Sequence, residues 1–246
     1  MVKQEIIVRQ SQRAIQYALD FLFPPHCAAC QKSGDILCPS CLAAIRPLAP
    51  PLCPQCGKAI PTYSIYGSCQ NCATHPLHMS GLRTVSIYQE PLRTCIHALK
   101  YEGNTRLAEP LGLLLAKAYQ AYGIRADVIV PVPLHSERQR QRGYNQTSLL
   151  AEVCARQVGI PLNNHMLVRH RATSAQVGLA AQERQQNVAG AFLCTPAFAT
   201  GRLSGRTILI IDDVCTTGAT IEACALPLFA AGAHAVWGLV LARPHA

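Results

Sequence analysis

The sequence predicts an α/β protein, in which a twisted parallel sheet with flanking helices follows a small cysteine-rich module. Three observations predict this fold class. Continuous runs of branched apolar residues, such as 208–211, are typical of strands buried on both faces of a parallel sheet. Segments with helical periodicity separate these runs. Four Cys-x-x-Cys pairs occur near the N-terminus, in a stretch with few large apolar side chains.

Composition indicates a globular protein with a substantial core and anionic partners. The 246 residues suffice for one mid-sized domain and a small one, since 50% are apolar and 14% are charged. The net charge of +9 favours a phosphorylated small molecule, nucleic acid, or both. Residues 1–12 are mixed polar, unlike a secretory signal. We therefore expect a cytoplasmic protein, where cysteines are more often metal ligands than disulfides.

The chain divides into three expected parts. Residues 1–23 contain a short helix that Pro24 and Pro25 stop, residues 24–80 form a double zinc ribbon, and residues 81–246 form the main α/β domain. The uncharged run 223–242 has the length of a membrane span. Pro227 and the break at 231–234 divide this run into a helix and a strand, so we expect no membrane insertion.

The cysteine pairs predict two structural zinc ions. The x-x spacing lets two thiolates of one tight turn bind the same tetrahedral Zn²⁺, and two such turns complete a Cys₄ site. Sequential pairing closes the shortest loops, although a crossed pairing uses the same residues. Disulfides and a redox pair are the weaker alternatives, and His26, His75 and His78 are expected to be bystanders. The ligands are Cys27, Cys30, Cys38, Cys41, Cys53, Cys56, Cys69 and Cys72.

The elements of the main domain follow from periodicity, caps and breakers. An edge strand is predicted over 82–88, and Asn104 and Asn145 are expected to cap helices. A polar stretch over 169–187 is expected to form a loop and a helix near the site, and 195–205 a linker hairpin. The predicted helices are 92–101, 107–122, 147–158 and 221–231, and the predicted buried strands are 127–130, 208–211 and 235–241.

The stretch after residue 211 carries the strongest functional signal. Asp212 and Asp213 stand where a buried strand leaves the core, and a small-residue loop, 216–220, then opens into a helix. Ligands of parallel sheets lie at the carboxyl ends of the strands, and such a loop presents N–H groups to an anion. The two acids suit hydroxyls or a bridging Mg²⁺. A plain strand end with a polar turn is the alternative. No Gly-x-x-x-x-Gly-Lys motif is present, which argues against a P-loop NTPase.

Two further segments favour a phosphorylated ligand. The turn at Pro131-Val132-Pro133 is rigid, although it also suits a simple strand terminator. Three arginines within five residues, Arg138, Arg140 and Arg142, can bind phosphate bidentately. Their spacing of two favours an extended or loop segment over one face of a helix. A solvated basic turn is the alternative, and the weaker candidates are Lys100, Arg169 and Arg171.

These motifs resemble type I phosphoribosyltransferases and, over residues 20–243, the ComF family of competence and DNA-utilisation proteins. The match includes the tandem Cys-x-x-Cys module, Pro-Val-Pro-Leu, Arg-x-Arg-Gly-Tyr-Asn-Gln, Arg-x-Arg-x-Thr-x-x-Gln and Asp-Asp followed by Thr-Thr-Gly-Ala-Thr. Tyr144 stands where the family often has Phe, a mild departure that keeps the ring. Cys215 varies in the family and is interpreted as a small filler, with a reactive thiol as the alternative.

The resemblance implies a binding site for phosphoribosyl pyrophosphate (PRPP) or a related phosphoribosyl ligand. Asp212 and Asp213 would hold the ribose hydroxyls and hydrated Mg²⁺. The 5-phosphate would lie on Thr216, Thr217, Gly218, Ala219 and Thr220, and the diphosphate on Pro131, Val132, Pro133 and Arg138. The candidates for catalysis are Asp212, Asp213, Arg140 and Arg142.

Two functions are compatible with these residues. The first is Mg²⁺-dependent phosphoribosyl transfer to an unknown acceptor, in DNA uptake or utilisation during natural transformation. The second is a non-catalytic competence factor that binds single-stranded DNA, uses PRPP only as a ligand or regulator, and meets competence or DNA-uptake proteins. Base stacking requires exposed aromatic residues beside basic groups. Aromatic residues are 6% of the chain, which weakens the case for a dedicated DNA binder.

Overall fold

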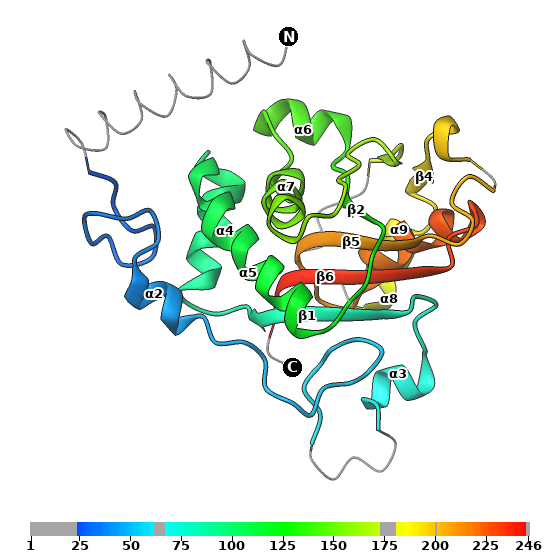
Figure 1. Ribbon diagram of the computed structural model, residues 1–246, viewed down its shortest axis with the longest axis horizontal. Coiled ribbons are helices and arrows are strands. Elements are labelled where there is room, and N and C mark those ends of the chain that lie inside the picture. Colours follow the sequence, from blue (N-terminus) through cyan, green and yellow to red (C-terminus); the bar gives the residue numbers. More distant parts are fainter. Residues whose placement is uncertain (1–23, 62–66, 173–180, 200, 245–246) are drawn as a thin grey trace.

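The computed structural model describes residues 24–61, 67–172, 181–199 and 201–244 (Figure 1). A four-stranded sheet forms its centre, and the cysteine-rich segments lie to one side of that sheet. The helix predicted within residues 1–23 lies outside the described residues.

The central sheet is entirely parallel, as predicted. Its strand order is β1-β6-β5-β2, so β1 is an edge strand and the last strand in the chain lies inside the sheet. A separate antiparallel pair, β3 and β4, lies beside it. The strands are β1 Gly81–Ile87, β2 Val128–Pro131, β3 Leu167–Arg169, β4 Phe192–Cys194, β5 Thr207–Val214 and β6 Ala235–Arg243.

The sheet is buried on both faces, because successive residues of its strands enter different cores. Leu209 and Ile211 pack with helices α4 (Leu92–Tyr101), α5 (Ala108–Ala121) and α7 (Gln146–Val158). Ile208 and Ile210 pack on the opposite side with α8 (Ala181–Val188) and α9 (Ala219–Ala230). This two-sided burial explains the continuous apolar runs and confirms the predicted parallel sheet with flanking helices.

Several predicted elements have the expected bounds. Helix α4 covers the predicted residues, and one 3₁₀ turn, η1 (Thr105–Leu107), precedes α5. The Asn145 side chain caps α7 by accepting a hydrogen bond from the Thr147 backbone N–H at 3.1 Å. The uncharged run divides as predicted, since α9 ends at Ala230 and β6 begins at Ala235. In the described part of the chain, no helix has both the length and the apolar character that a bilayer span requires.

Three local predictions were wrong. The arginine segment forms helix α6 (Ser136–Arg142), because Glu, Arg and Gln are strong helix formers and Gly143, at φ +83°, ends the helix. Strand β5 continues beyond Ile211 through both acids, since β6 pairs alongside as far as Val214. The linker near 195–205 contains a 3₁₀ turn, η2 (Pro196–Phe198), and in place of a hairpin its Ser204 forms an isolated antiparallel bridge with Ala233.

The cysteine-rich segments form two ribbons with the same plan (Figure 1). Each begins with a tight turn closed by an antiparallel bridge, His26 with Ser33 and Leu52 with Ala59. In each ribbon a short helix then follows, and the second cysteine pair lies at its start: one cysteine directly precedes the helix and the other lies within it. These helices are α2 (Pro39–Ala44) and α3 (Gln70–Thr74). We call these segments the first ribbon (residues 24–48) and the second ribbon (residues 49–61 and 67–80).

Candidate functional site

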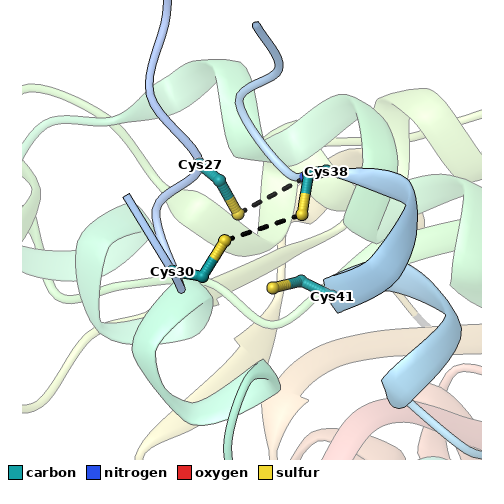
Figure 2. A group of neighbouring side chains, drawn as sticks. All are labelled: Cys27, Cys30, Cys38 and Cys41. Carbon is teal, nitrogen blue, oxygen red and sulfur yellow. Dashed lines mark hydrogen bonds between the residues drawn. The ribbon is translucent and has the colours of Figure 1, made fainter. Parts of the chain in front are cut away.

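The first ribbon brings four sulfur atoms together. Figure 2 shows the side chains of Cys27, Cys30, Cys38 and Cys41 pointing toward one another, with all four Sγ atoms within 4.8 Å. The Sγ atoms of Cys30 and Cys38 are 3.7 Å apart. Four sulfurs around a tetrahedral Zn²⁺ at about 2.3 Å lie about 3.8 Å from one another. The cluster therefore has the dimensions of a Cys₄ zinc site.

The second ribbon repeats this arrangement with Cys53, Cys56, Cys69 and Cys72. Their Sγ atoms also lie within 4.8 Å of one another, and those of Cys56 and Cys69 are 3.6 Å apart. The predicted sequential pairing is thus confirmed for both clusters. The groups of potential metal ligands found among the described residues contain only cysteines, as expected for His26, His75 and His78.

Backbone N–H groups prepare one thiol of each cluster for metal binding. Burial opposes ionisation of Cys27, but the N–H groups of Cys38, Cys30 and Ala29 outweigh it and lower the pKa to about 6. Burial also opposes ionisation of Cys53, whose pKa is nevertheless lowered to about 7 by neighbouring N–H groups. Since thiolates are the metal ligands, this environment fits two structural zinc ions.

The acid pair at the end of β5 is buried and held by two other elements. Lys100, in the last turn of α4, places its Nζ 2.6 Å from Asp213 Oδ1. Gln146, the first residue of α7, donates from Nε2 to Asp213 Oδ2 at 2.7 Å. The Asp213 backbone N–H donates to Asp212 Oδ1 at 2.9 Å. The carboxyl ends of the strands therefore carry a fixed acid–base cluster.

Asp212 has an environment that favours its protonated form. Burial, followed by the negative charge of Asp213, raises the pKa of Asp212 to about 7, although Lys100 and Arg169 act in the opposite direction. Burial disfavours the charge of Lys100, but the Asp213 carboxylate outweighs that effect and raises the pKa of Lys100. A cation bound at Asp212 would replace its proton.

The loop over 216–220 joins β5 to the N-terminus of α9. Gly218 adopts φ +95° directly before the helix, a conformation that favours glycine. Thr217 Oγ1 accepts from the Ala219 N–H at 3.3 Å. Because the first N–H groups of a helix lack intrahelical acceptors, this end of the 12-residue α9 can accommodate an anion.

The turn after β2 is held in place by α7. The Val132 carbonyl accepts from Thr147 Oγ1 at 2.7 Å and from Asn145 Nδ2 at 3.1 Å. The Val132 N–H donates to the Ile211 carbonyl at 2.9 Å. The N–H and the carbonyl of Val132 therefore already have protein partners. A diphosphate at this turn would have to be bound by residues next to Val132.

The three arginines of α6 have different surroundings. Arg138 lines a pocket of about 210 Å³ together with His135, Glu137, Gln141, Arg169 and Ala172. Arg142 donates to Gln146 Oε1 and lies 5.2 Å from the centre of the Tyr101 ring. Arg140 is exposed. Arg138 is thus near the pocket, whereas Arg142 supports the glutamine that holds Asp213.

The structure adds residues that the sequence ranked low or missed. Lys100 was a weaker candidate, yet it contacts the acid pair directly. Gln146 was noted only within a motif, and its contact with Asp213 spans 67 residues. No sequence motif includes Arg243, although it joins the second ribbon to Cys215. Their positions at the ends of elements give no local signal of these contacts.

Comparison with known proteins adds family membership to this geometry. A double zinc ribbon domain model matches residues 18–73. Competence protein F of Haemophilus influenzae is 33% identical over 181 residues, which cover 71% of this chain and 78% of that protein. The chain belongs to the ComF family. DNA utilization protein YhgH of Escherichia coli is 35% identical over 190 residues, 75% of this chain and 81% of that protein.

A more distant relative and two solved structures extend the comparison. Competence protein ComFC of Bacillus subtilis is 26% identical and covers 69% of each chain. A glutamine PRPP amidotransferase from B. subtilis matches 54% of this ComF chain and 25% of its own, with 22% identity and a TM-score of 0.36. A Trypanosoma cruzi hypoxanthine phosphoribosyl transferase matches 58% of this chain and 65% of its own, with 15% identity and a TM-score of 0.33.

Proposed function

We propose that this ComF-family protein binds PRPP together with Mg²⁺ and transfers the phosphoribosyl group to an acceptor during DNA uptake or utilisation. The observation that carries the proposal is the buried pair Asp212–Asp213, fixed by Lys100 and followed by the loop at the N-terminus of α9. Two acids that can bind the ribose and the metal thus lie next to N–H groups that can bind a phosphate, at one edge of the sheet. The similarity to a competence protein and a DNA utilization protein supports the pathway.

The proposed reaction breaks the bond between the anomeric carbon and the diphosphate as an acceptor atom bonds to that carbon. Bound Mg²⁺ would neutralise the leaving diphosphate. Asp212 and Asp213 orient the ribose hydroxyls, and Lys100 holds the Asp213 side chain in place. Arg138 and Arg169 supply positive charge at the pocket beside the site. The loop at 216–220 anchors the 5-phosphate and thereby fixes the sugar for attack.

Calorimetric titration of PRPP, with and without Mg²⁺, tests this function. Zinc-loaded wild-type protein is expected to bind in a Mg²⁺-dependent manner, and the double variant Asp212→Asn/Asp213→Asn is expected to lose that binding. Asp127→Asn is a control, because Asp127 lies at the opposite end of the sheet. Zinc content and thermal unfolding report whether each variant is folded. Unchanged affinity in the folded double variant would contradict the site.

The pH dependence of binding tests the role of Asp212. Metal binding requires the ionised acid, so Mg²⁺-dependent affinity is expected to rise with pH and level off above about 7. The unfolded chain ionises this acid near its ordinary value of 3.8, so the folded protein holds the extra proton between these values. Stability of the ligand-free protein should therefore fall as pH rises through this window. Asp212→Asn should flatten both profiles, and a profile unaffected by this substitution would contradict the assignment.

A second candidate function rests on Tyr101. Its side chain is 66% exposed, and both Arg142 and His97 lie beside the ring. An exposed ring beside a guanidinium suits stacking of an unpaired base. We propose, as the alternative, a non-catalytic protein that binds single-stranded DNA here and uses PRPP as a regulator. It would act in the cytoplasm beside competence proteins. Fluorescence anisotropy with labelled oligonucleotides tests it, since Tyr101→Ala should weaken binding several-fold without changing PRPP affinity.

A further inference from the structure

The second ribbon is fastened to the main domain through three consecutive backbone carbonyls of its cysteine turn. The Pro54 carbonyl accepts from Arg83 Nη1 at 2.8 Å, and the Gln55 carbonyl accepts from the Leu82 N–H at 2.7 Å. The Cys56 carbonyl accepts from Arg243 Nη1 at 2.7 Å. These acceptors lie in or beside the zinc-binding turn, so their positions depend on the metal that holds the turn.

Arg243 connects this turn to the start of the anion loop. It is the last residue of β6, its side chain is 7% exposed, and its Nη2 lies 3.6 Å from Cys215 Sγ. The Cys215 N–H donates to the Ala242 carbonyl at 2.9 Å, which fixes this residue against the same strand. Cys215 directly precedes Thr216. One buried guanidinium therefore joins a zinc-binding turn to the loop over 216–220.

A second set of contacts joins the same two regions independently of Arg243. The Leu77 N–H donates to the Gln55 side chain at 3.2 Å, and the Leu77 side chain lies next to Gly218. The backbone N–H of His78 donates to the Glu222 carboxylate in the first turn of α9. The second ribbon thus supports both the beginning and the end of the loop. The first ribbon packs elsewhere, against the core of α4 and α5.

We propose that Arg243 is a positioning residue that makes the conformation of the loop over 216–220 depend on zinc in the second ribbon. Without the metal, the turn loosens and the Cys56 carbonyl moves, so Arg243 can no longer hold Cys215 in place. By linkage, an anion bound at the loop stabilises the zinc-loaded form of the second ribbon. The part concerning the anion rests on the proposed function, whereas the dependence of the loop on Arg243 does not.

Hydrogen exchange of the peptide covering 216–220 tests the dependence without any ligand. Arg243→Gln is expected to speed exchange of this loop at least tenfold in protein that retains two zinc ions. Arg83→Gln is the matched control, because this substitution removes a hydrogen bond to the Pro54 carbonyl, whereas Arg83 has no contact with Cys215. It should leave exchange of the loop unchanged. Equal exchange in the two variants, or wild-type exchange in Arg243→Gln, would overturn the proposal.

Trp237 provides a separate check that Arg243→Gln keeps the second ribbon docked. It is the single tryptophan of the chain, and the Arg83 guanidinium lies 5.0 Å from the centre of its ring. Its fluorescence in Arg243→Gln should therefore match the wild type. If Arg243→Gln fails to fold, Arg243→Lys replaces it. Lys keeps the charge but cannot reach both partners as a planar fork does, so the same rise in loop exchange is expected.

Zinc release to a colorimetric chelator tests the linkage. Protein with its first cluster removed by Cys27→Ser/Cys30→Ser isolates release from the second. Mg²⁺ with PRPP should slow this release at least fivefold in otherwise wild-type protein, and not in Arg243→Gln. If calorimetry detects PRPP binding but release is unchanged, the linkage is wrong. If PRPP does not bind, the proposed function fails, and the exchange experiment still decides the role of Arg243.

Discussion

The two zinc ribbons share a plan but are attached to the protein in different ways. In the first, Gln31 donates its N–H to the Cys27 carbonyl at 2.8 Å, and in the second, Gly57 donates to the Cys53 carbonyl at 2.8 Å. Both donors have left-handed backbones, at φ 63° and 67°. The turns are therefore equivalent, and the differences between the ribbons come from what surrounds them.

The first ribbon is attached by apolar packing around its cysteine turn, and its hydrogen bonds to β1 lie outside that turn. They run from the Leu48 N–H to the Val85 carbonyl at 3.0 Å and from Ser86 Oγ to the Arg46 carbonyl at 2.8 Å. Leu37 and Ile45 are buried with Cys27 in the core that contains α4 and α5, while Cys30 is exposed. The second ribbon buries all four of its cysteines in a small cluster of their own and is attached by hydrogen bonds to its carbonyls. The comparison teaches that the same metal chemistry can stabilise one part of a protein and position another, depending on the contacts of the turn.

Removing either metal should have the largest effect. Wild-type protein is expected to contain two zinc ions, and each contributes on the order of 10 kcal/mol to folding of its ribbon. Cys53→Ser/Cys56→Ser and Cys27→Ser/Cys30→Ser should each leave one zinc ion by elemental analysis. Only the former should also abolish PRPP binding in calorimetry. Equal loss of binding in both variants would remove the distinction between the ribbons.

Truncating apolar side chains should affect the first ribbon more. Leu37→Ala opens a cavity in the shared core and is expected to destabilise the protein by about 2–4 kcal/mol in urea unfolding. Ile60→Ala in the second ribbon should have a smaller effect, because that side chain is only half-buried beside the cysteine cluster. A larger effect of Ile60→Ala would mean that the second ribbon also depends on apolar packing.

Adding one methyl group tests the close approach of the second ribbon to β1. A Cβ at Gly57 would lie 2.5 Å from the Leu82 carbonyl oxygen, so Gly57→Ala should cost about 1–3 kcal/mol and speed zinc release. Gly67→Ala is the matched control, since Gly67 has φ +60° and no described residue lies within 4 Å of that Cβ. It should cost only about 1 kcal/mol. Equal losses of stability in the two variants would show that only backbone strain matters at Gly57.

Removing the outermost contact should have the smallest effect. His78→Ala deletes the side-chain contact of Nδ1 with the Glu222 carboxylate at 2.8 Å, but the His78 side chain is 76% exposed. Such a pair contributes about 0.2–1 kcal/mol, so thermal unfolding should hardly change and loop exchange should stay at the wild-type value. A large rise in loop exchange would transfer the positioning role from Arg243 to His78.

Local chemistry in the sequence predicted much of the fold and part of the site. The x-x spacing fixed each cysteine pair, and the two-sided apolar runs at 208–211 and 235–241 predicted central strands correctly. The arginine segment was wrongly interpreted, because its spacing was given more weight than the helix propensity of its residues. The extension of β5 through the acids depends on its neighbour β6, which no local pattern encodes.

The contacts that hold the candidate site together could not be predicted, because each joins residues distant in the chain. Lys100 reaches Asp213 from the end of α4, and Arg243 reaches Cys56 across 187 residues. A lysine or arginine at the end of an element usually faces solvent, so residue type alone gives no reason to bury it. Only the strand order, which places β6 between β1 and β5, brings these partners together.

That strand order also has a consequence for how the protein is made. Strand β1 pairs only with β6 in the central sheet, and β6 is its last strand to leave the ribosome. The zinc-binding turns and β1 are synthesised long before Arg243 and the rest of β6. The sheet edge of β1 and the Cys56 carbonyl of the second ribbon therefore remain unpaired until translation has passed residue 243. During this interval they form an open template for other chains, which makes early zinc capture and chaperone contact important for the nascent protein.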